Sequence, residues 1–298
     1  MSDQLIDRFG RKIKSLRISV TSRCNQNCIY CHNEGEVKEK NSEIAIETVS
    51  KLVSAASSFG VKKVKFSGGE PLIRADFADI VSALPELDEI SVTTNGTLLS
   101  RYARDLAEAG VGRVNISLDS LIDDKYRFIT GSNRSMLPKV LAGIDSATEA
   151  GLTPIKLNMV LLRGINDSEI SDMIEFAKGR ALILQLIELM DFGNIREYQV
   201  DMIGIEDMLK SNAESIVSRD MHHRKKYFID GAEVEVVRPI DNSEFCANCS
   251  RLRLTSDGKL KPCLLSNDNL FDINGLTKDE MREALKMAVS RREPFFRG

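Results

Sequence analysis

The six cysteines are the residues of this chain with the clearest chemical meaning, because they fall into two groups of three. The groups are Cys24, Cys28 and Cys31, and then Cys246, Cys249 and Cys263. Three thiolates on one short loop can hold three irons of a [4Fe–4S] cluster and leave the fourth iron open to a small molecule. Since an electron-transfer cluster ordinarily takes four cysteines, each group predicts chemistry at an open iron.

Two other uses of these cysteines stay open at this point. The first group could bind zinc with His32 or a distant cysteine as fourth ligand, and the second could be a zinc ribbon. Disulfides are disfavoured, because a chain of 298 residues with 42% hydrophobic residues can build its own core and carries no export signal.

Two arginines lie inside the second cysteine group, at Arg251 and Arg253. In an extended strand, residues two apart share a face, so both guanidinium groups point the same way. Paired guanidinium groups suit phosphate oxygens, which they bind bidentately. In isolation the pair would be a solvated strand face, but beside an open-iron cluster it predicts a phosphorylated substrate.

The elements that must position these residues alternate between strands and helices. The predicted strands are Leu16–Val20, Lys62–Ser67, Glu89–Thr94, Arg113–Leu118, Ile155–Leu161 and Leu182–Glu188, with helical patterns between them. Such alternation indicates a parallel sheet with right-handed crossovers. We therefore expect an α/β fold, a partial (βα)6 TIM-type barrel with a C-terminal cluster-binding extension.

Polar and apolar residues alternate within four of these strands. Arg17, Lys65, Asn115 and Lys156 lie in polar rows, and the residues beside them in each strand are apolar. Because successive strand residues face opposite sides, the apolar rows should pack on helices and the polar rows should line a cavity. Three cations on one cavity wall need counter-charge, which an anionic ligand would supply. The sixth strand follows this alternation less well, because its polar residues Gln185 and Glu188 would face opposite sides.

The alternation ends after Met190, which divides the chain into a barrel (residues 1–192) and an extension (193–298) that carries the second cysteine group and closes the barrel. Hairpin turns are expected at Asp230-Gly231 and Asp257-Gly258, and a final helix over Lys278–Ser290. The run from His222 to Lys226 is interpreted as a solvated surface.

Composition limits the remaining possibilities. The net charge of −3 gives no support for bulk nucleic-acid binding. No apolar run approaches the roughly 18 residues that a membrane helix needs. The polar N-terminus lacks the layout of a signal peptide. We expect a cytoplasmic protein with no membrane and no nucleic-acid partner.

The first cysteine group, with Tyr30 as the aromatic residue before Cys31, resembles the signature of the radical S-adenosylmethionine (SAM) superfamily. The segment Gly68-Gly69-Glu70 after the second strand is similar to that family's Gly-Gly-Glu segment, which holds the methionine amino group. The resemblance implies a full or partial β/α barrel and a cluster whose open iron chelates SAM.

Taken together, the motifs resemble the GTP 3′,8-cyclase family, the radical SAM lyases of molybdenum cofactor biosynthesis. The resemblance implies that the six cysteines bind two [4Fe–4S] clusters, with Cys24, Cys28, Cys31 and Arg17 catalytic. The implied SAM contacts are Tyr30, Gly68, Gly69, Glu70, Ser117 and Met190. The implied GTP contacts are Arg17, Lys65, Thr93, Lys156, Arg251 and Arg253.

The resemblance also implies the reaction. A radical derived from SAM removes the ribose 3′ hydrogen of GTP, and the 3′ carbon then attacks guanine C8 to give 3′,8-cyclo-7,8-dihydro-GTP. Implied partners are an external electron donor, a downstream pyranopterin synthase and a second copy of the chain. The alternatives are another two-cluster radical SAM enzyme, such as a peptide-modifying one, and a non-catalytic metal-binding module.

The chain departs from this family pattern at two places. Family members commonly end in a Gly-Gly pair, where this chain has the single Gly298. The sixth strand commonly contains Arg-Phe-Ile-Glu, where this chain has Gln185-Leu186-Ile187-Glu188, so one cation near the substrate is missing. Neither change removes a cluster ligand, so both bear on efficiency more than on reaction class.

Overall fold

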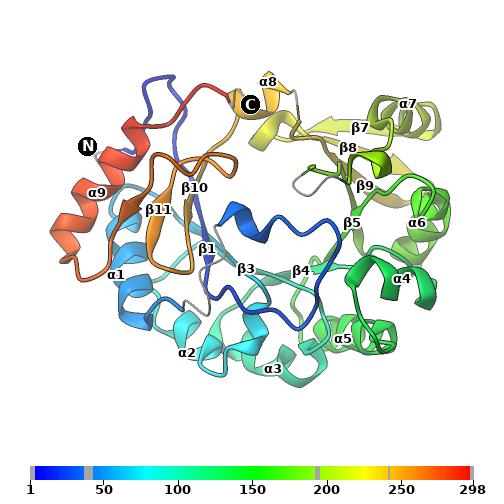
Figure 1. Cartoon of the computed structure of the whole chain (residues 1–298), viewed down its shortest axis with the longest axis horizontal. Coiled ribbons are helices and arrows are strands. Elements are labelled where there is room, and N and C mark those ends of the chain that lie inside the picture. Colours follow the sequence, from blue (N-terminus) through cyan, green and yellow to red (C-terminus); the bar gives the residue numbers. More distant parts are fainter. Residues whose placement is uncertain (1–3, 37–42, 192–194, 241, 296–298) are drawn as a thin grey trace.

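The structure, a computed structural model, describes residues 4–36, 43–191, 195–240 and 242–295. Six parallel strands form a curved wall with helices on its outer side (Figure 1). The strands are β1 (Ser15–Ser19), β2 (Lys63–Ser67), β3 (Glu89–Thr94), β4 (Arg113–Ser117), β5 (Lys156–Val160) and β6 (Ile183–Ile187). The helices are α1 (Ile46–Ser57), α2 (Phe77–Ser82), α3 (Leu99–Ala109), α4 (Asp123–Thr130), α5 (Leu137–Glu149) and α6 (Ile170–Lys178).

This arrangement confirms the predicted partial barrel. The six expected strands are found, with ends that differ by at most one residue, and they are neighbours in chain order from β1 to β6. Each neighbouring pair is parallel. Parallel neighbours need a crossover connection, and the intervening helices provide it. The carboxyl ends of all six strands therefore point to one mouth of the barrel.

The rest of the chain adds strands at both edges of this wall. Beyond β6 lie β9 (Ala232–Val237), β8 (Lys225–Ile229) and β7 (Ser215–Ser218), and beyond β1 lie β10 (Arg251–Leu254), β11 (Lys259–Lys261) and β12 (Phe271–Asp272). The remaining helices are α7 (Met202–Asn212), α8 (Ser243–Ala247) and α9 (Lys278–Ser290). Both expected hairpin turns and the final helix are present.

The twelve-stranded sheet begins at β12 and ends at β7. Among the described residues these edge strands do not pair, so the extension widens the barrel at both edges and the hydrogen-bonded sheet stays open. The expectation that the extension closes the barrel is therefore not met by strand pairing.

The alternation of side chains along the strands separates core from cavity. In β1, Leu16 and Ile18 are buried against the helical layer, whereas Arg17 lines the inner cavity. The core continues from the barrel to α9, which packs beside α1 (Figure 1). The polar rows predicted from sequence thus face inward.

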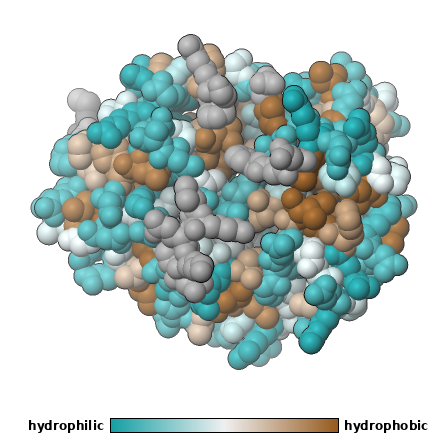
Figure 2. Space-filling model, in the orientation of Figure 1, coloured by the Kyte–Doolittle hydropathy of each residue, from teal (hydrophilic) through white to brown (hydrophobic). Residues whose placement is uncertain are grey.

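The face that carries the barrel mouth is mainly hydrophilic in Figure 2. No helix in the described part of the chain is long and apolar enough to cross a membrane.

Candidate active site

A large cavity opens inside the barrel. Its volume is about 1460 Å³, and all six barrel strands and β10 contribute to its lining. Typical small-molecule sites occupy roughly 300–1,000 Å³, so this cavity has room for more than one ligand. Every site residue predicted from sequence lines it, with the exception of Glu70.

The first cysteine loop begins directly after β1 and is fixed by the Gly-Gly-Glu segment. The Gly69 N–H donates to Thr21 O and the Glu70 N–H donates to Arg23 O, both at 2.8 Å. A Cβ on Gly69 would lie 2.1 Å from Arg23 O, so only glycine fits this close approach. The glycine pair therefore sets the position at which Cys24 enters the cavity.

The middle of the same loop, between Cys24 and Cys31, is held by α4. The Asn27 N–H donates to Thr130 O and the Ile29 N–H donates to Ile129 O. Gly131, which ends α4 with a φ of +60°, packs directly on Asn27 O. The loop is thus fixed at its start and in its middle, while its three cysteines line the cavity.

The donor set fits the two predicted clusters. All six cysteines are free thiols, and all six line this one cavity. Burial raises the pKa of Cys24, and raises that of Cys28 well above its usual range. Positively charged iron would favour the thiolate forms that such a site requires. In the described segments, no three His, Cys, Asp or Glu side chains converge as they would around a single ion.

The residues expected to contact SAM lie around the first cysteine loop. Tyr30, Gly68, Gly69, Ser117 and Met190 line the cavity. The Tyr30 hydroxyl donates to Asp119 Oδ2 at 2.6 Å, and Asp119 Oδ1 accepts from the Val160 N–H. This carboxylate therefore ties Tyr30 to the carboxyl end of the barrel strands.

Glu70 differs from its prediction as a cofactor contact. Its side chain is fully buried and does not line the cavity. One carboxylate oxygen accepts from the Leu72 N–H and the Thr94 hydroxyl, and the other from the Asn95 N–H. All these donors belong to the protein, so Glu70 holds the turn after β2 against the end of β3.

Strand register places cations side by side across the cavity wall. Arg17 on β1 is the partner of Arg253 on β10 and of Lys65 on β2. The same row continues through Ser91 to Arg113 on β4. Like charges opposite one another destabilise a sheet, so this cationic row needs anions nearby.

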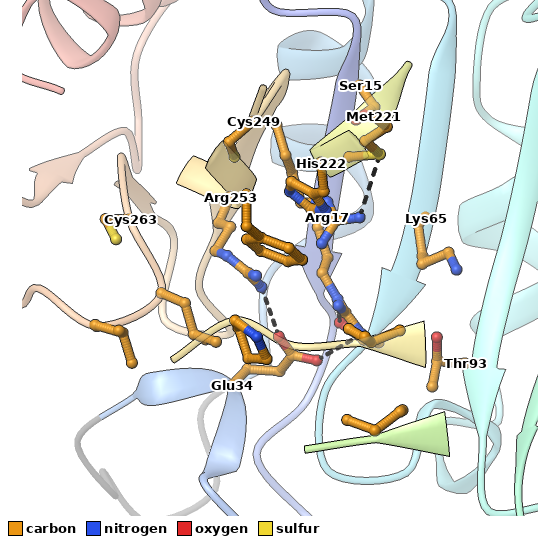
Figure 3. Close-up of a pocket in the computed structure, with 18 of the residues that line it drawn as sticks. Ser15, Arg17, Glu34, Lys65, Thr93, Met221, His222, Cys249, Arg253 and Cys263 are labelled. Carbon is orange, nitrogen blue, oxygen red and sulfur yellow. Dashed lines mark hydrogen bonds and ion pairs between the residues drawn. The ribbon is translucent and has the colours of Figure 1, made fainter. Parts of the chain in front are cut away.

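Glu34 supplies one of those anions from the first cysteine loop. Its carboxylate lies 3.0 Å from Arg17 Nη2 and 2.8 Å from Arg253 Nη1, as the dashed lines in Figure 3 show. Although burial opposes ionisation, the two arginines lower the pKa of Glu34 to about 2. On the other side of Arg17, Lys65 has no hydrogen bond or ion pair with any residue that the structure describes. Burial, followed by the charges of Arg113, Arg17 and other arginines, puts its pKa well below the usual range.

The remaining side chains predicted to contact the substrate differ in how many hydrogen-bond or ion-pair partners the protein itself gives them. Arg251 and Arg253 share a face of β10 as expected. Among the described residues, the one hydrogen-bond partner of the Arg251 guanidinium is the sulfur of Met221, at 3.8 Å. The Thr93 hydroxyl is buried without a partner in the described structure. Lys156, by contrast, lies 2.5 Å from the Glu235 carboxylate. Protein carboxylates therefore supply part of the counter-charge that was expected from a ligand.

The prediction for residues 222–226 was wrong for two of the five. His222 is buried, and both His222 and Arg224 line the cavity, whereas Lys225 is exposed. The imidazole stacks on Phe245 with ring centroids 3.7 Å apart. Burial and four surrounding arginines lower the pKa of His222 and keep it neutral. Residues 222–226 are too short a charged run to show a periodicity, so the sequence could not reveal that His222 and Arg224 turn toward the cavity.

Of the two positions at which the sequence differs from the family pattern, the structure describes Gln185 but not the C-terminal glycine. Gln185 is buried at the cavity wall, where its amide donates to Glu235 Oε2 at 2.5 Å. The tail with Phe296, Arg297 and Gly298 lies outside the described residues.

Comparison with known proteins shows which class of protein has this fold and this cysteine loop. The model of the radical SAM superfamily matches residues 18–177, and that of the Molybdenum Cofactor Synthesis C family matches residues 182–296. Solved structures share the fold. SuiB of Streptococcus suis bound to S-adenosylmethionine has a TM-score of 0.66 at 14% identity, covering 96% of this chain and 76% of that one. Native anSMEcpe with bound AdoMet has a TM-score of 0.64 at 19% identity, covering 92% and 81%. The fold and the cysteine loop thus define a radical SAM protein.

Closer relatives narrow this class. A protein of Methanocella arvoryzae named "Probable GTP 3′,8-cyclase" is 54% identical over 98% of this chain and 95% of its own length. One of Methanosarcina mazei with the same name is 54% identical over 98% and 90%. The chain belongs to the radical SAM superfamily and, within it, to the family of these relatives.

Several cavity residues were missed by the sequence analysis. Arg113 has the parity of Asn115 and Ser117, so the alternation in that strand could have revealed it. Glu34 and Arg219 carried no comparable signal, because loop geometry brings them to the cavity. Glu235, which is fully buried and pairs with Arg219, was also missed, because the pairing of β9 with β6 places it.

Proposed function

We propose that this chain is a GTP 3′,8-cyclase, which converts GTP to 3′,8-cyclo-7,8-dihydro-GTP in the first step of molybdenum cofactor biosynthesis. One observation carries the proposal: both three-cysteine groups and the cationic row on β10, β1 and β2 line the same cavity. The name of the relatives at 54% identity supports it.

The bound clusters and SAM would supply one-electron cleavage of the SAM sulfonium and removal of a hydrogen atom from the substrate. The protein's own part is position, charge and exclusion of water. Cys24, Cys28 and Cys31 would hold the first cluster beside Tyr30, Gly68, Gly69, Ser117 and Met190, which would contact SAM. Glu70 is reassigned as a positioning residue. Cys246, Cys249 and Cys263 would hold the second cluster, whose open iron suits the guanine base.

The phosphate groups of GTP fit the cationic row. Arg17, Arg251 and Arg253 present guanidinium groups that can bind phosphate oxygens bidentately, and Lys65 adds a point charge. Thr93 has a buried hydroxyl ready for a polar ligand atom. Lys156 would contact the substrate while it remains paired with Glu235.

The proposal includes partners and organisation. An external donor would supply the electron, and a downstream pyranopterin synthase would take the product. A homodimer, a cytoplasmic location and the absence of nucleic-acid and membrane partners are part of the same proposal, as is the division into a barrel (1–192) and an extension (193–298).

The experiment is anaerobic incubation of the iron- and sulfide-loaded full chain with SAM and dithionite, with GTP, with ATP or without nucleotide. The proposal expects GTP alone to raise 5′-deoxyadenosine and to yield a cyclised nucleotide. Equal 5′-deoxyadenosine in all three samples, with GTP unchanged, would point to another radical SAM substrate such as a peptide. Two zinc ions and no acid-labile sulfide in the protein as purified would point to a non-catalytic module.

A further inference from the structure

The loop between β7 and β8 enters the cavity beside β10, where the sulfur of Met221 lies 3.8 Å from Arg251 Nη2. Its ends are joined by a bond from the Arg219 N–H to Arg224 O at 2.9 Å. The loop is also attached to the second cysteine segment, because the His222 N–H donates to Asn248 O and the His222 ring stacks on Phe245. Arg219 and Arg224 are therefore held in the cavity wall by structure on both sides.

A fully buried carboxylate, Glu235 on β9, gathers the cations of this wall. Lys156 Nζ lies at 2.5 Å, Arg219 Nη1 at 2.9 Å and Arg224 Nη1 at 3.6 Å from its oxygens. These charges lower the pKa of Glu235 to about 2, against the effect of burial. Three cations face one carboxylate, so the wall keeps an excess of positive charge.

Arg224 is the member of this cluster with the most unused hydrogen-bonding capacity. Its Nε is buried and has no acceptor among the described residues, and its contact with Glu235 is the longest of the three. Burial and the neighbouring Arg219 and Arg113 lower its pKa to about 10, although Glu235 opposes the shift. A buried guanidinium without a full set of acceptors is costly unless a ligand completes it.

We propose that Arg224, assisted by Arg219 and oriented by Glu235, binds the terminal phosphates of the substrate and thereby selects a nucleoside triphosphate over its monophosphate. Arg224 is the binding residue, and Glu235 is a positioning residue. The identity of the nucleotide rests on the proposed function, whereas recognition of the polyphosphate rests on these side chains alone.

The test is equilibrium binding to the anaerobic, cluster-loaded full chain, with GTP, GMP and inorganic tripolyphosphate as separate probes. The variant is Arg224→Gln, and the matched control is Lys225→Gln, the exposed neighbour that does not line the cavity. Loss of a charge-assisted contact should weaken GTP and tripolyphosphate by about tenfold to a hundredfold. GMP binding and the control variant should stay close to wild type.

Arg224→Lys keeps the charge without the planar fork, so it should restore part of the tripolyphosphate affinity. Unchanged binding of all three probes by Arg224→Gln would overturn the proposal. Equal weakening of GMP and GTP would also overturn it, because that pattern indicates a structural role. If tripolyphosphate binding depends on Arg224 but GTP neither raises 5′-deoxyadenosine nor is cyclised in the activity assay, this inference stands and the proposed function fails.

Discussion

Glu34 and Arg253 form an ion pair of 2.8 Å between segments 219 positions apart in the chain. Glu34 follows the first cysteine group, and Arg253 lies within the second. The contact continues at Gly35, whose O accepts from Lys261 Nζ and whose Cα packs against Leu264 beside Cys263. The two cysteine-bearing segments therefore form one packed unit.

Replacing Glu34 with Gln should destabilise the ligand-free protein. The change leaves Arg17 and Arg253 side by side without their shared carboxylate, and breaking such a buried pair costs on the order of 3 kcal/mol of unfolding free energy. Denaturant unfolding of the anaerobic protein measures this loss.

Tripolyphosphate should restore more stability to Glu34→Gln than it adds to the wild type, because it replaces the missing negative charge. Glu47→Gln, at an exposed i,i+4 pair with Lys51, is the control and should unfold as the wild type does. An unfolding curve of Glu34→Gln that matches the wild type would show that Glu34 does not hold the two arginines.

Gly69→Ala should impair loading of the first cluster. A Cβ at this position would collide with Arg23 O and would break the two backbone bonds that fix the start of the cysteine loop. Iron and sulfide should fall by about half, since the second cysteine group does not depend on this turn. Gly112→Ala, where the nearest atom is Ile90 O at 3.8 Å, should load normally. Full iron content in Gly69→Ala would contradict the account.

Glu70→Gln should lower stability by about 1–3 kcal/mol, because an amide N–H₂ replaces an acceptor among buried N–H donors. Chemical denaturation measures the change. The opposite pattern, in which stability is unchanged and SAM affinity is lost, would show that Glu70 contacts the cofactor as its sequence context suggested.

The affinity for a polyphosphate should fall as the pH rises through about 8. Burial, and then the charges of Arg219 and Arg224, lower the pKa of Lys156 to about 8 despite Glu235. Anion binding favours the protonated amine, so it weakens once the proton is lost. For the ligand-free protein the sign is reversed: the folded pKa lies below the unfolded value near 10.4, so this group adds stability as pH rises from 8 toward that value.

Lys156→Arg separates this effect from other titrations, because a guanidinium stays charged over the whole range. Its tripolyphosphate affinity should lack the decrease near pH 8. Lys65, whose pKa burial and neighbouring arginines place well below the usual range, is the same in both proteins. An identical pH profile for the variant and the wild type would exclude Lys156 as the titrating group.

The barrel strands and one cavity wall could be predicted from sequence because they rest on local patterns. Two-residue alternation in β1 and β2 places Arg17 and Lys65 inward, and the same rule holds for Arg251 and Arg253 on β10. Alternation says nothing about which strand lies beside which. The pairing of β10 with β1, which brings Arg253 next to Arg17, emerges only in the folded sheet.

The cluster of charges around Glu235 could not be predicted from sequence, for a related reason. Glu235 reaches Lys156 because β9 pairs with β6, and Arg224 reaches Glu235 because a hairpin loop turns inward. The contact of Lys156 with Glu235 joins positions 79 apart, so no spacing in the sequence reports it. Arg224 and Glu235 lie on the two sides of the hairpin at Asp230-Gly231, but the hairpin signal does not show that the segment before β8 turns inward. Glu70 shows the converse, since the Gly-Gly-Glu motif predicted a cofactor contact but could not show that the carboxylate accepts from backbone N–H groups.

The account's central claim is that one cavity holds SAM against the ribose of GTP, and isotope transfer tests it most directly. The cluster-loaded protein would be incubated with SAM, dithionite and GTP deuterated at the ribose 3′ carbon, and the products analysed by mass spectrometry. The account predicts deuterium in 5′-deoxyadenosine together with a cyclised nucleotide that has lost it. Unlabelled 5′-deoxyadenosine beside intact, fully deuterated GTP would contradict it.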